Sequence, residues 1–162
     1  MPNATLLWVR KDLRLHDNPA LCAALDRGHP VIPVFIWAPQ EEGDWPPGAA
    51  SRWWLHHSLQ RYAARLEHDG SRLVIRQGES LTVLRQLIAT TGARVVMWNR
   101  RYEPAAIARD TEVKSQLQQE GLAVHSYNSA LLHEPWTIQK AAGGPFQVFT
   151  AFWKACAQQG DV

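Results

Sequence analysis

Two charged segments of the sequence carry side chains that could hold a polar ligand. Residues 10–19 (RKDLRLHDNP) follow the apolar run 6–9, and residues 99–104 (NRRYEP) follow the apolar run 95–98. Each has the form of a buried strand, a charged loop and a helix that begins at proline. In an open parallel sheet, the loops at the carboxyl ends of the strands build the ligand crevice where the strand order reverses. With the strand order 3-2-1-4-5, these two loops meet at one edge of the sheet.

The rest of the sequence supplies the elements that such a site needs. Short apolar runs rich in β-branched residues alternate with longer helical patterns, which predicts an α/β fold. The expected architecture is a five-stranded parallel Rossmann-like sheet, order 3-2-1-4-5, with helices on both faces. Strands are expected over residues 5–9, 31–37, 72–76, 94–98 and 122–127. Helices are expected after the cap Asn18, around the stripe Leu55–Leu66, after a cap at Ser80, from Pro104, and over 146–153.

Length, charge and cysteine content limit the class of protein. With 162 residues and 46% hydrophobic residues, the chain can form one domain with a real core. Its net charge of +2 is nearly balanced, and no long basic run marks a polyanion-binding surface. Cys22 and Cys156 form neither a disulfide framework nor a metal-ligand spacing, so we expect no metal. No apolar run approaches ~20 residues, so we expect no membrane partner and a soluble, cytoplasmic protein.

Eight residues near the expected strand ends are candidates for contact with a bound ligand. Flat ligands favour pockets with aromatic walls and a few fixed polar groups, which Trp37, Arg52 and Glu103 could supply. Structural roles are alternatives to ligand binding for these residues. Ion pairing within the loop is favoured for Arg10, and packing in the core is favoured for Trp37. The favourable charge at a helix start explains Glu103 equally well. The eight are Arg10, Trp37, Ala38, Glu41, Arg52, Asn99, Arg101 and Glu103.

No group of residues forms a persuasive catalytic set. The sequence has no Gly-rich dinucleotide fingerprint, no phosphate-binding lysine loop and no Gly-x-Ser-x-Gly elbow. His56 and His57 are neighbours on a helix and do not form a one-face metal pair. We therefore expect this chain to catalyse no reaction by itself.

The eight tryptophans are expected to have packing roles. Trp8, Trp37 and Trp98 occupy corresponding strand positions and are expected to pack between sheet and helices. Trp53 and Trp54 are adjacent on a helix and so face different directions. We expect one of them to pack on the sheet and the other to lie near a partner.

Six segments resemble the amino-terminal α/β domain of DNA photolyases and cryptochromes. They occur in family order and cover nearly the whole chain. The second and third are similar to plant cryptochromes and the photolyases nearest to them. Ala151 departs from the pattern, since many members carry proline there. The segments are Trp8–Leu21, Phe35–Pro39 with Glu41–Gly43, Ser51–Leu55, Trp98–Pro104, Leu131–Leu132 with Glu134–Trp136, and Phe146–Lys154.

The resemblance implies a light-harvesting domain of a longer protein. Residues 1–130 would hold an antenna pigment, either methenyltetrahydrofolate or a deazaflavin, and residues 131–162 would begin the linker to an absent helical FAD-binding domain. That domain would be the partner of this chain, and only the complete protein would bind DNA. The complete protein would be a deoxyribodipyrimidine photo-lyase or a blue-light-sensing cryptochrome. Some folate-binding members carry an Asn-Glu pair where this chain has Ala105 and Ala106, which argues against their pocket geometry here.

Two other functions stay open. One is a free-standing nucleotide-binding α/β protein with an adenine nucleotide in the crevice between the two charged loops. The missing phosphate-binding loop disfavours it. The other is a short cryptochrome-like regulator that docks on a partner.

Overall fold

The computed structural model describes residues 3–158, which fall into two compact units with the boundary along the chain between Ser129 and Ala130. The first unit contains all of the strands and four of the α-helices. Its elements are β1 (Thr5–Val9), α1 (Pro19–Asp26), β2 (Val31–Trp37), the 3-10 turn η1 (Pro39–Glu41), α2 (Ala49–His68), β3 (Val74–Gln77), α3 (Ser80–Thr91), β4 (Val95–Asn99), α4 (Pro104–Gln119) and β5 (Ala123–Tyr127). The second unit contains α5 (Phe149–Gln158).

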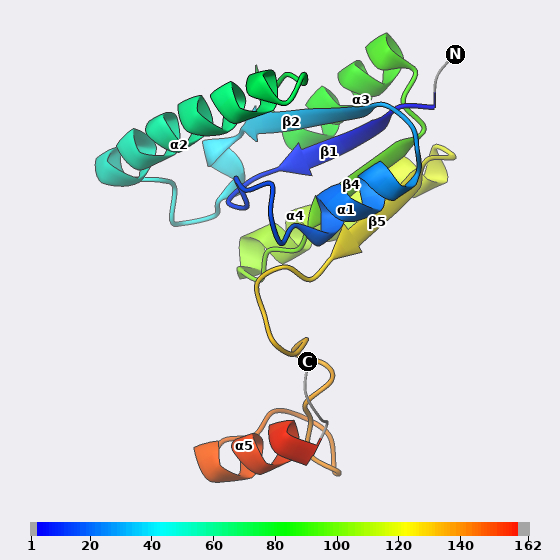
Figure 1. Ribbon diagram of the computed structural model, residues 1–162. Helices are drawn as coiled ribbons and strands as arrows, with labels where there is room; N and C mark the ends of the chain where they lie inside the picture. The colour runs from blue at the N-terminus through cyan, green and yellow to red at the C-terminus, as the bar shows by residue number, and fades with distance from the viewer. Residues whose placement is uncertain (1–2, 159–162) are drawn as a thin grey trace. The chain divides into compact units, whose positions relative to one another are not determined.

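The five strands form one parallel sheet in the order β3-β2-β1-β4-β5, as the sequence predicts (Figure 1). Thr5 of the central strand β1 pairs with Val31 of β2 on one side and with Val95 of β4 on the other. All five residues of β1 and all five of β4 are buried. The strand order reverses between these two strands, so the loops that follow them lie at the switch point of the sheet.

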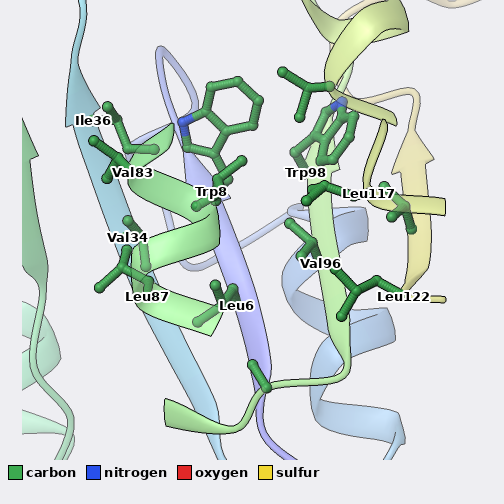
Figure 2. Close-up of a cluster of buried hydrophobic side chains, with 14 of the residues drawn as sticks. Leu6, Trp8, Val34, Ile36, Val83, Leu87, Val96, Trp98, Leu117 and Leu122 are labelled. Carbon is green, nitrogen blue, oxygen red and sulfur yellow. The ribbon is translucent and has the colours of Figure 1, made fainter. Parts of the chain in front are cut away.

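Each face of the sheet is covered by two helices and has its own apolar core. Helices α3 and α4 pack on one face, where Trp8 and Trp98 are the largest fully buried side chains (Figure 2). Their rings meet edge to face, with centroids 5.5 Å apart. Helices α1 and α2 pack on the other face, around Leu7, Val9 and Phe35. The predicted arrangement of helices on both faces is confirmed.

The helix starts confirm one predicted cap and correct another. Asn18 caps α1, since its side chain accepts a hydrogen bond from the backbone N–H of Leu21 over 3.1 Å. The predicted cap Ser80 is instead the first residue of α3, and Glu79 takes the cap position. The hydroxyl of Ser80 donates to a carboxylate oxygen of Glu41 from the loop after β2. Ser80 therefore joins two segments instead of closing its own helix.

The prediction that Trp53 or Trp54 packs on the sheet is wrong. The exposed fractions of these residues are 63% and 71%. Both tryptophans are exposed because α2 packs on the sheet mainly through its second half, where its only buried residues, Tyr62 and Leu66, lie. In the first half of the helix, only the partly buried Leu55 packs against the core.

In the second unit, the helix predicted over 146–153 is present as α5, but it begins at Phe149 and extends to Gln158. Phe149 stacks on Trp153 with ring centroids 6.4 Å apart, while Cys156 is buried. Phe149 and Trp153 are 74% and 60% exposed. Over residues 3–158, no helix is both long and apolar enough to cross a membrane. Within the same residues, His, Cys, Asp and Glu side chains form no cluster that could hold a metal ion.

Candidate ligand-binding site

Arg10 is a buried charge at the end of β1. Its Nη1 donates to Oδ2 of Asp110 over 2.9 Å, and its Nη2 donates to the backbone carbonyl of Asn99. The guanidinium lies 4.4 Å from the ring centroid of Trp8 and 5.9 Å from that of Trp98. Only 5% of Arg10 is exposed, and burial lowers its pKa although Asp110 opposes this shift. The buried side chain of Arg10 thus connects the end of β1 to β4 and to α4.

Asn99 fixes the end of β4 to the start of α1. Its Nδ2 donates to Oδ2 of Asp12 over 2.6 Å and to Oδ1 of Asn18 over 2.7 Å. Its Oδ1 accepts a hydrogen bond from the backbone N–H of Ala20 over 3.1 Å. Both donors and the oxygen of this buried amide are already bonded within the protein, which indicates a structural role.

Ion pairs join the loop after β4 to the loops after β1 and β2. Arg101 donates from Nη1 and Nη2 to the two carboxylate oxygens of Glu42, over 2.6 Å each. Its Nη2 also lies 3.0 Å from Glu103, which Lys11 reaches from the β1 loop over 2.5 Å. The side chain of Arg101 is 9% exposed, so the fork-shaped contact with Glu42 is largely shielded from water. The three loops are thereby held at one edge of the sheet.

Arg109 of α4 extends this cluster toward the core. Its Nη1 lies 3.7 Å from a carboxylate oxygen of Glu42 and 4.0 Å from one of Glu41, and its Nη2 lies 2.7 Å from Asp110. Glu41 itself accepts hydrogen bonds from the backbone N–H and the hydroxyl of Ser80. The carboxylate of Glu41 thus supplies a hydrogen-bond acceptor for the first backbone N–H of α3.

Two carboxylates of the cluster, those of Glu42 and Glu103, have lowered pKa values and are stabilised in their charged form. Hydrogen bonds from Arg101 are the main cause that lowers the pKa of Glu42. Burial acts in the opposite direction on Glu103, but hydrogen bonds from Arg101 and Lys11 hold its pKa well below the usual range. A carboxylate whose pKa is lowered on folding stabilises the fold above its unfolded pKa, about 4.3 for Glu. That stabilisation is lost as the pH falls through the folded pKa.

We expect Glu42→Gln to lower the free energy of unfolding by about 1–3 kcal/mol at pH 7, because glutamine cannot accept both charged hydrogen bonds from Arg101. The difference from the unmodified chain should shrink as the pH falls below about 4, since Glu42 is then increasingly protonated. Urea unfolding at a series of pH values measures this difference in the free energy of unfolding. Glu67→Gln on the exposed part of α2 is the control, with an expected change within about 0.5 kcal/mol. A difference that does not vary with pH would contradict the lowered pKa of Glu42.

A small cavity of about 80 Å³ lies beside these loops. Trp8 and Arg10 line it, and their Nε1 and Nε atoms are buried donors without a hydrogen-bond partner among the described residues. A cavity of this size has room for water. An acceptor atom in it, from water or from the polar edge of a ligand, would satisfy these donors.

A larger groove of about 600 Å³ lies between α2 and the strands β2 and β3. It is present because no side chain in the first half of α2 is fully buried, and only the partly buried Leu55 packs against the core there. The groove and the small cavity share Phe35, Trp37 and Leu55, so the two adjoin. The apolar lining of the groove is Phe35, Trp37, Leu55, Leu59, Ala63 and Ile75, and its polar lining is Arg52, His56, Gln60, Arg76 and Gln77.

The loop between η1 and α2 lies against the first turn of α4. Gly43 has a φ of 63°, in the left-handed region that favours glycine. A Cβ placed on Gly43 would lie 3.1 Å from the Cβ of Ala105. The close approach of these two segments therefore depends on two of the smallest residues.

The structure divides the eight predicted site residues into two groups. Four line the small cavity, namely Arg10, Trp37, Ala38 and Arg101, and Arg52 lines the groove together with Trp37. The other three line neither space: Glu41 bonds to Ser80, Asn99 to Asn18 and Asp12, and Glu103 to Lys11 and Arg101. Contact of any of the eight with a ligand stays a prediction.

Sequence reasoning missed Arg109 and Asp110, although a signal for Asp110 exists. In α4 the buried residues Ala106, Asp110, Val113 and Leu117 are spaced as one helical face. A carboxylate on a buried face needs a charged or hydrogen-bonding partner, so this spacing predicts a buried cation nearby. The groove was missed for another reason, since the stripe containing Leu55 and Leu59 was identified but nothing in the sequence shows that it stays uncovered.

Comparisons with known proteins agree with the fold and with the sequence resemblance. The chain is 49% identical to a deoxyribodipyrimidine photo-lyase of Agrobacterium fabrum over 150 residues, which cover 93% of this chain and 31% of that protein. It is 45% identical to cryptochrome-2 of Arabidopsis thaliana over 157 residues, which cover 96% of this chain and 26% of that protein. The chain thus spans about a third or less of the length of these relatives.

Solved structures and a family model give the same result. A bacterial class III photolyase from Agrobacterium tumefaciens matches with a TM-score of 0.88 and 45% identity, over 100% of this chain and 33% of that one. An archaeal photolyase from Sulfolobus tokodaii, described with two FAD molecules and a novel light-harvesting cofactor, matches with a TM-score of 0.82 and 26% identity, over 98% of this chain and 36% of that one. The DNA photolyase family model matches residues 5–161. This chain belongs to the DNA photolyase family, and it corresponds to the N-terminal α/β domain of photolyases and cryptochromes.

Proposed function

We propose that this chain is a light-harvesting domain and that the groove beside α2 holds its antenna pigment. The observation that carries this is the groove itself. Its volume of about 600 Å³ lies within the range of roughly 300–1,000 Å³ that is common for small-molecule sites. Aromatic and aliphatic side chains line it, as a flat pigment requires. Trp37 and Arg52 are the predicted site residues that take part.

The polar groups around the groove suit a pigment with an acidic or carbonyl-bearing edge. Arg52 has no ion pair among the residues that the structure describes, so its guanidinium is available to a carboxylate of the ligand. The unsatisfied donors of Arg10 and Trp8 lie in the adjoining cavity. An acceptor on the pigment that reaches this cavity would bond to them. Methenyltetrahydrofolate and a deazaflavin both have such groups.

In the longer protein, the pigment would pass excitation energy to FAD in a helical domain. Residues 1–130 would form the pigment-binding domain, and residues 131–162 would begin the link to the helical domain. That domain would hold the FAD and bind DNA, for light-driven repair or for blue-light sensing. Energy transfer needs only a pigment held at a fixed separation and orientation, so this half of the protein needs no acid, base or nucleophile. The archaeal photolyase from Sulfolobus tokodaii, described with two FAD molecules and a novel light-harvesting cofactor, is a relative that supports this proposal.

We expect the 162-residue chain to bind methenyltetrahydrofolate or a deazaflavin saturably, with a shift of the pigment's absorption band. Leu59→Trp should weaken this binding by at least about tenfold, or roughly 1.4 kcal/mol, because the indole fills the groove. Titration followed by absorption and fluorescence measures both.

The matched control is Leu25→Trp on α1, since Leu25 is 58% exposed and does not line the groove. This variant should bind the pigment as the unmodified chain does. Circular dichroism spectra of the two variants check that each is folded. The proposal fails if Leu59→Trp leaves the affinity unchanged, or if neither pigment binds.

The alternative of an adenine nucleotide at the switch point gains no support. The edge of the sheet between β1 and β4 is occupied by the buried side chains of Arg10 and Asn99. The hydrogen-bonding groups of Asn99 are bonded within the protein, so they are not available to a ribose or a phosphate.

A further inference from the structure

A third space in the fold has a different chemical character from the groove and the cavity. This pocket of about 390 Å³ lies between α2 and the loop that follows β1, and it shares no residue with the other two. The α2 residues that line it, Ser58, Arg61, Tyr62 and Arg65, form one face of the helix, because each has a neighbour three or four positions away. The lining is Leu13, Arg14, Leu15, His16, Ser58, Arg61, Tyr62 and Arg65.

The pocket is strongly cationic. Three arginines line it and no Asp or Glu does. Arg61 has no ion pair among the described residues, and the partner of Arg65 is the exposed Asp69, 2.9 Å away. Exposed pairs of this kind bind weakly and exchange readily with other anions. Arg14 donates to the backbone carbonyls of Asp17 and Ser129, and its Nη2 lies 3.9 Å from the exposed carboxylate of Asp17.

Tyr62 adds a buried donor to this cationic lining. The residue is 4% exposed, and its hydroxyl has no hydrogen-bond partner among the described residues. Burial, together with the negative charge of Asp12, raises its pKa to about 12, so the hydroxyl keeps its proton. A buried O–H without an acceptor destabilises a fold. An oxygen atom bound in the pocket would supply the missing acceptor.

We propose that this pocket binds a phosphate group, with Arg14, Arg61 and Arg65 providing the charge and the Tyr62 hydroxyl donating a hydrogen bond. Phosphate fits better than a carboxylate because it carries up to two negative charges and three acceptor oxygens, which match several guanidinium groups at once. The group is free inorganic phosphate or the phosphate of a nucleotide. The site is independent of the pigment groove, which lies on another face of α2.

The test is titration of the 162-residue chain with inorganic phosphate and with AMP, followed by calorimetry at low salt and at constant ionic strength. We expect Arg61→Gln and Tyr62→Phe each to weaken phosphate binding roughly tenfold, the size expected for one charge-assisted hydrogen bond. Arg94→Gln is the matched control, because it removes an exposed arginine at the start of β4, at the opposite end of the sheet. It should change the affinity by less than about twofold.

The outcomes separate the sources and decide the proposal. Tighter binding of AMP than of phosphate identifies a nucleotide as the ligand, and equal binding identifies the phosphate group alone. Leu59→Trp, which fills the groove, should leave phosphate binding unchanged. The proposal is overturned if phosphate does not bind, or if Arg94→Gln weakens binding as much as Arg61→Gln and Tyr62→Phe do. The second result would show attraction to overall positive charge only.

Discussion

Asp110→Ala is expected to lower the free energy of unfolding by about 3–5 kcal/mol, the usual cost of removing one partner of a buried ion pair. Asp110 is 9% exposed and accepts the hydrogen bond from Nη1 of Arg10, which is itself 5% exposed. Without the carboxylate, the charge of Arg10 stays in the core and keeps the carbonyl of Asn99, the rings of Trp8 and Trp98, and the more distant charge of Asp12 as compensation. Urea unfolding of the 162-residue chain measures the loss.

A double-mutant cycle separates the interaction energy of the Arg10–Asp110 pair from the effects of each residue on its other neighbours. Arg10→Met with Asp110→Leu replaces both charges by apolar side chains, and it should be much less destabilised than the sum of the single changes. Arg65→Gln breaks the exposed pair with Asp69 and serves as the control, with an expected loss of about 0–1 kcal/mol. If Asp110→Ala costs no more than Arg65→Gln, Arg10 is not held by Asp110 as described.

Trp98→Ala is the second change with a large expected effect, a loss of about 3–5 kcal/mol in the free energy of unfolding. Trp98 is 1% exposed and packs edge to face on Trp8 between the sheet and the helices. Alanine leaves a cavity that the surrounding strands cannot close, because both β1 and β4 are buried along their whole length. The midpoint of thermal unfolding and the urea transition should both shift.

The control for this change is Trp54→Ala on α2. Trp54 is 71% exposed, so the loss should stay within about 0.5 kcal/mol. Equal losses in the two variants would mean that Trp54 is buried in solution or that Trp98 is not.

The topology could be predicted from the sequence because the residues that start helices and strands act locally along the chain. Asn18 with Pro19, and Pro104 at the next switch-point loop, mark the helix starts, and the apolar runs between them are too short for helices. The position of β3 was less well predicted, at 72–76 against the observed Val74–Gln77. An edge strand buries less, and Ile75 is 49% exposed, so its apolar pattern is weak.

The meeting of the two charged loops was also predictable, but the partners of their charges were not. Lys11 and Glu103 lie 2.5 Å apart across the switch point, as the strand order implies. Arg10 and Arg101, however, pair with Asp110 and Glu42, which come from elements distant in the sequence. Charge patterns show that a loop needs partners, while only the packing of α4 and the β2 loop shows which partners it has.

The contact of Gly43 with Ala105 sets a size limit at the first turn of α4. A Cβ placed on Gly43 would already lie 3.1 Å from the Cβ of Ala105, so a side chain longer than a methyl group at position 105 would crowd the loop between η1 and α2. Ala106, one residue on, is 2% exposed and has no room to grow either. The loop at Gly43 therefore lies close to one of the two positions where some folate-binding members of the resembled family carry Asn and Glu. A larger residue at position 105 would therefore require the loop that contains Gly43 to shift away from the start of α4.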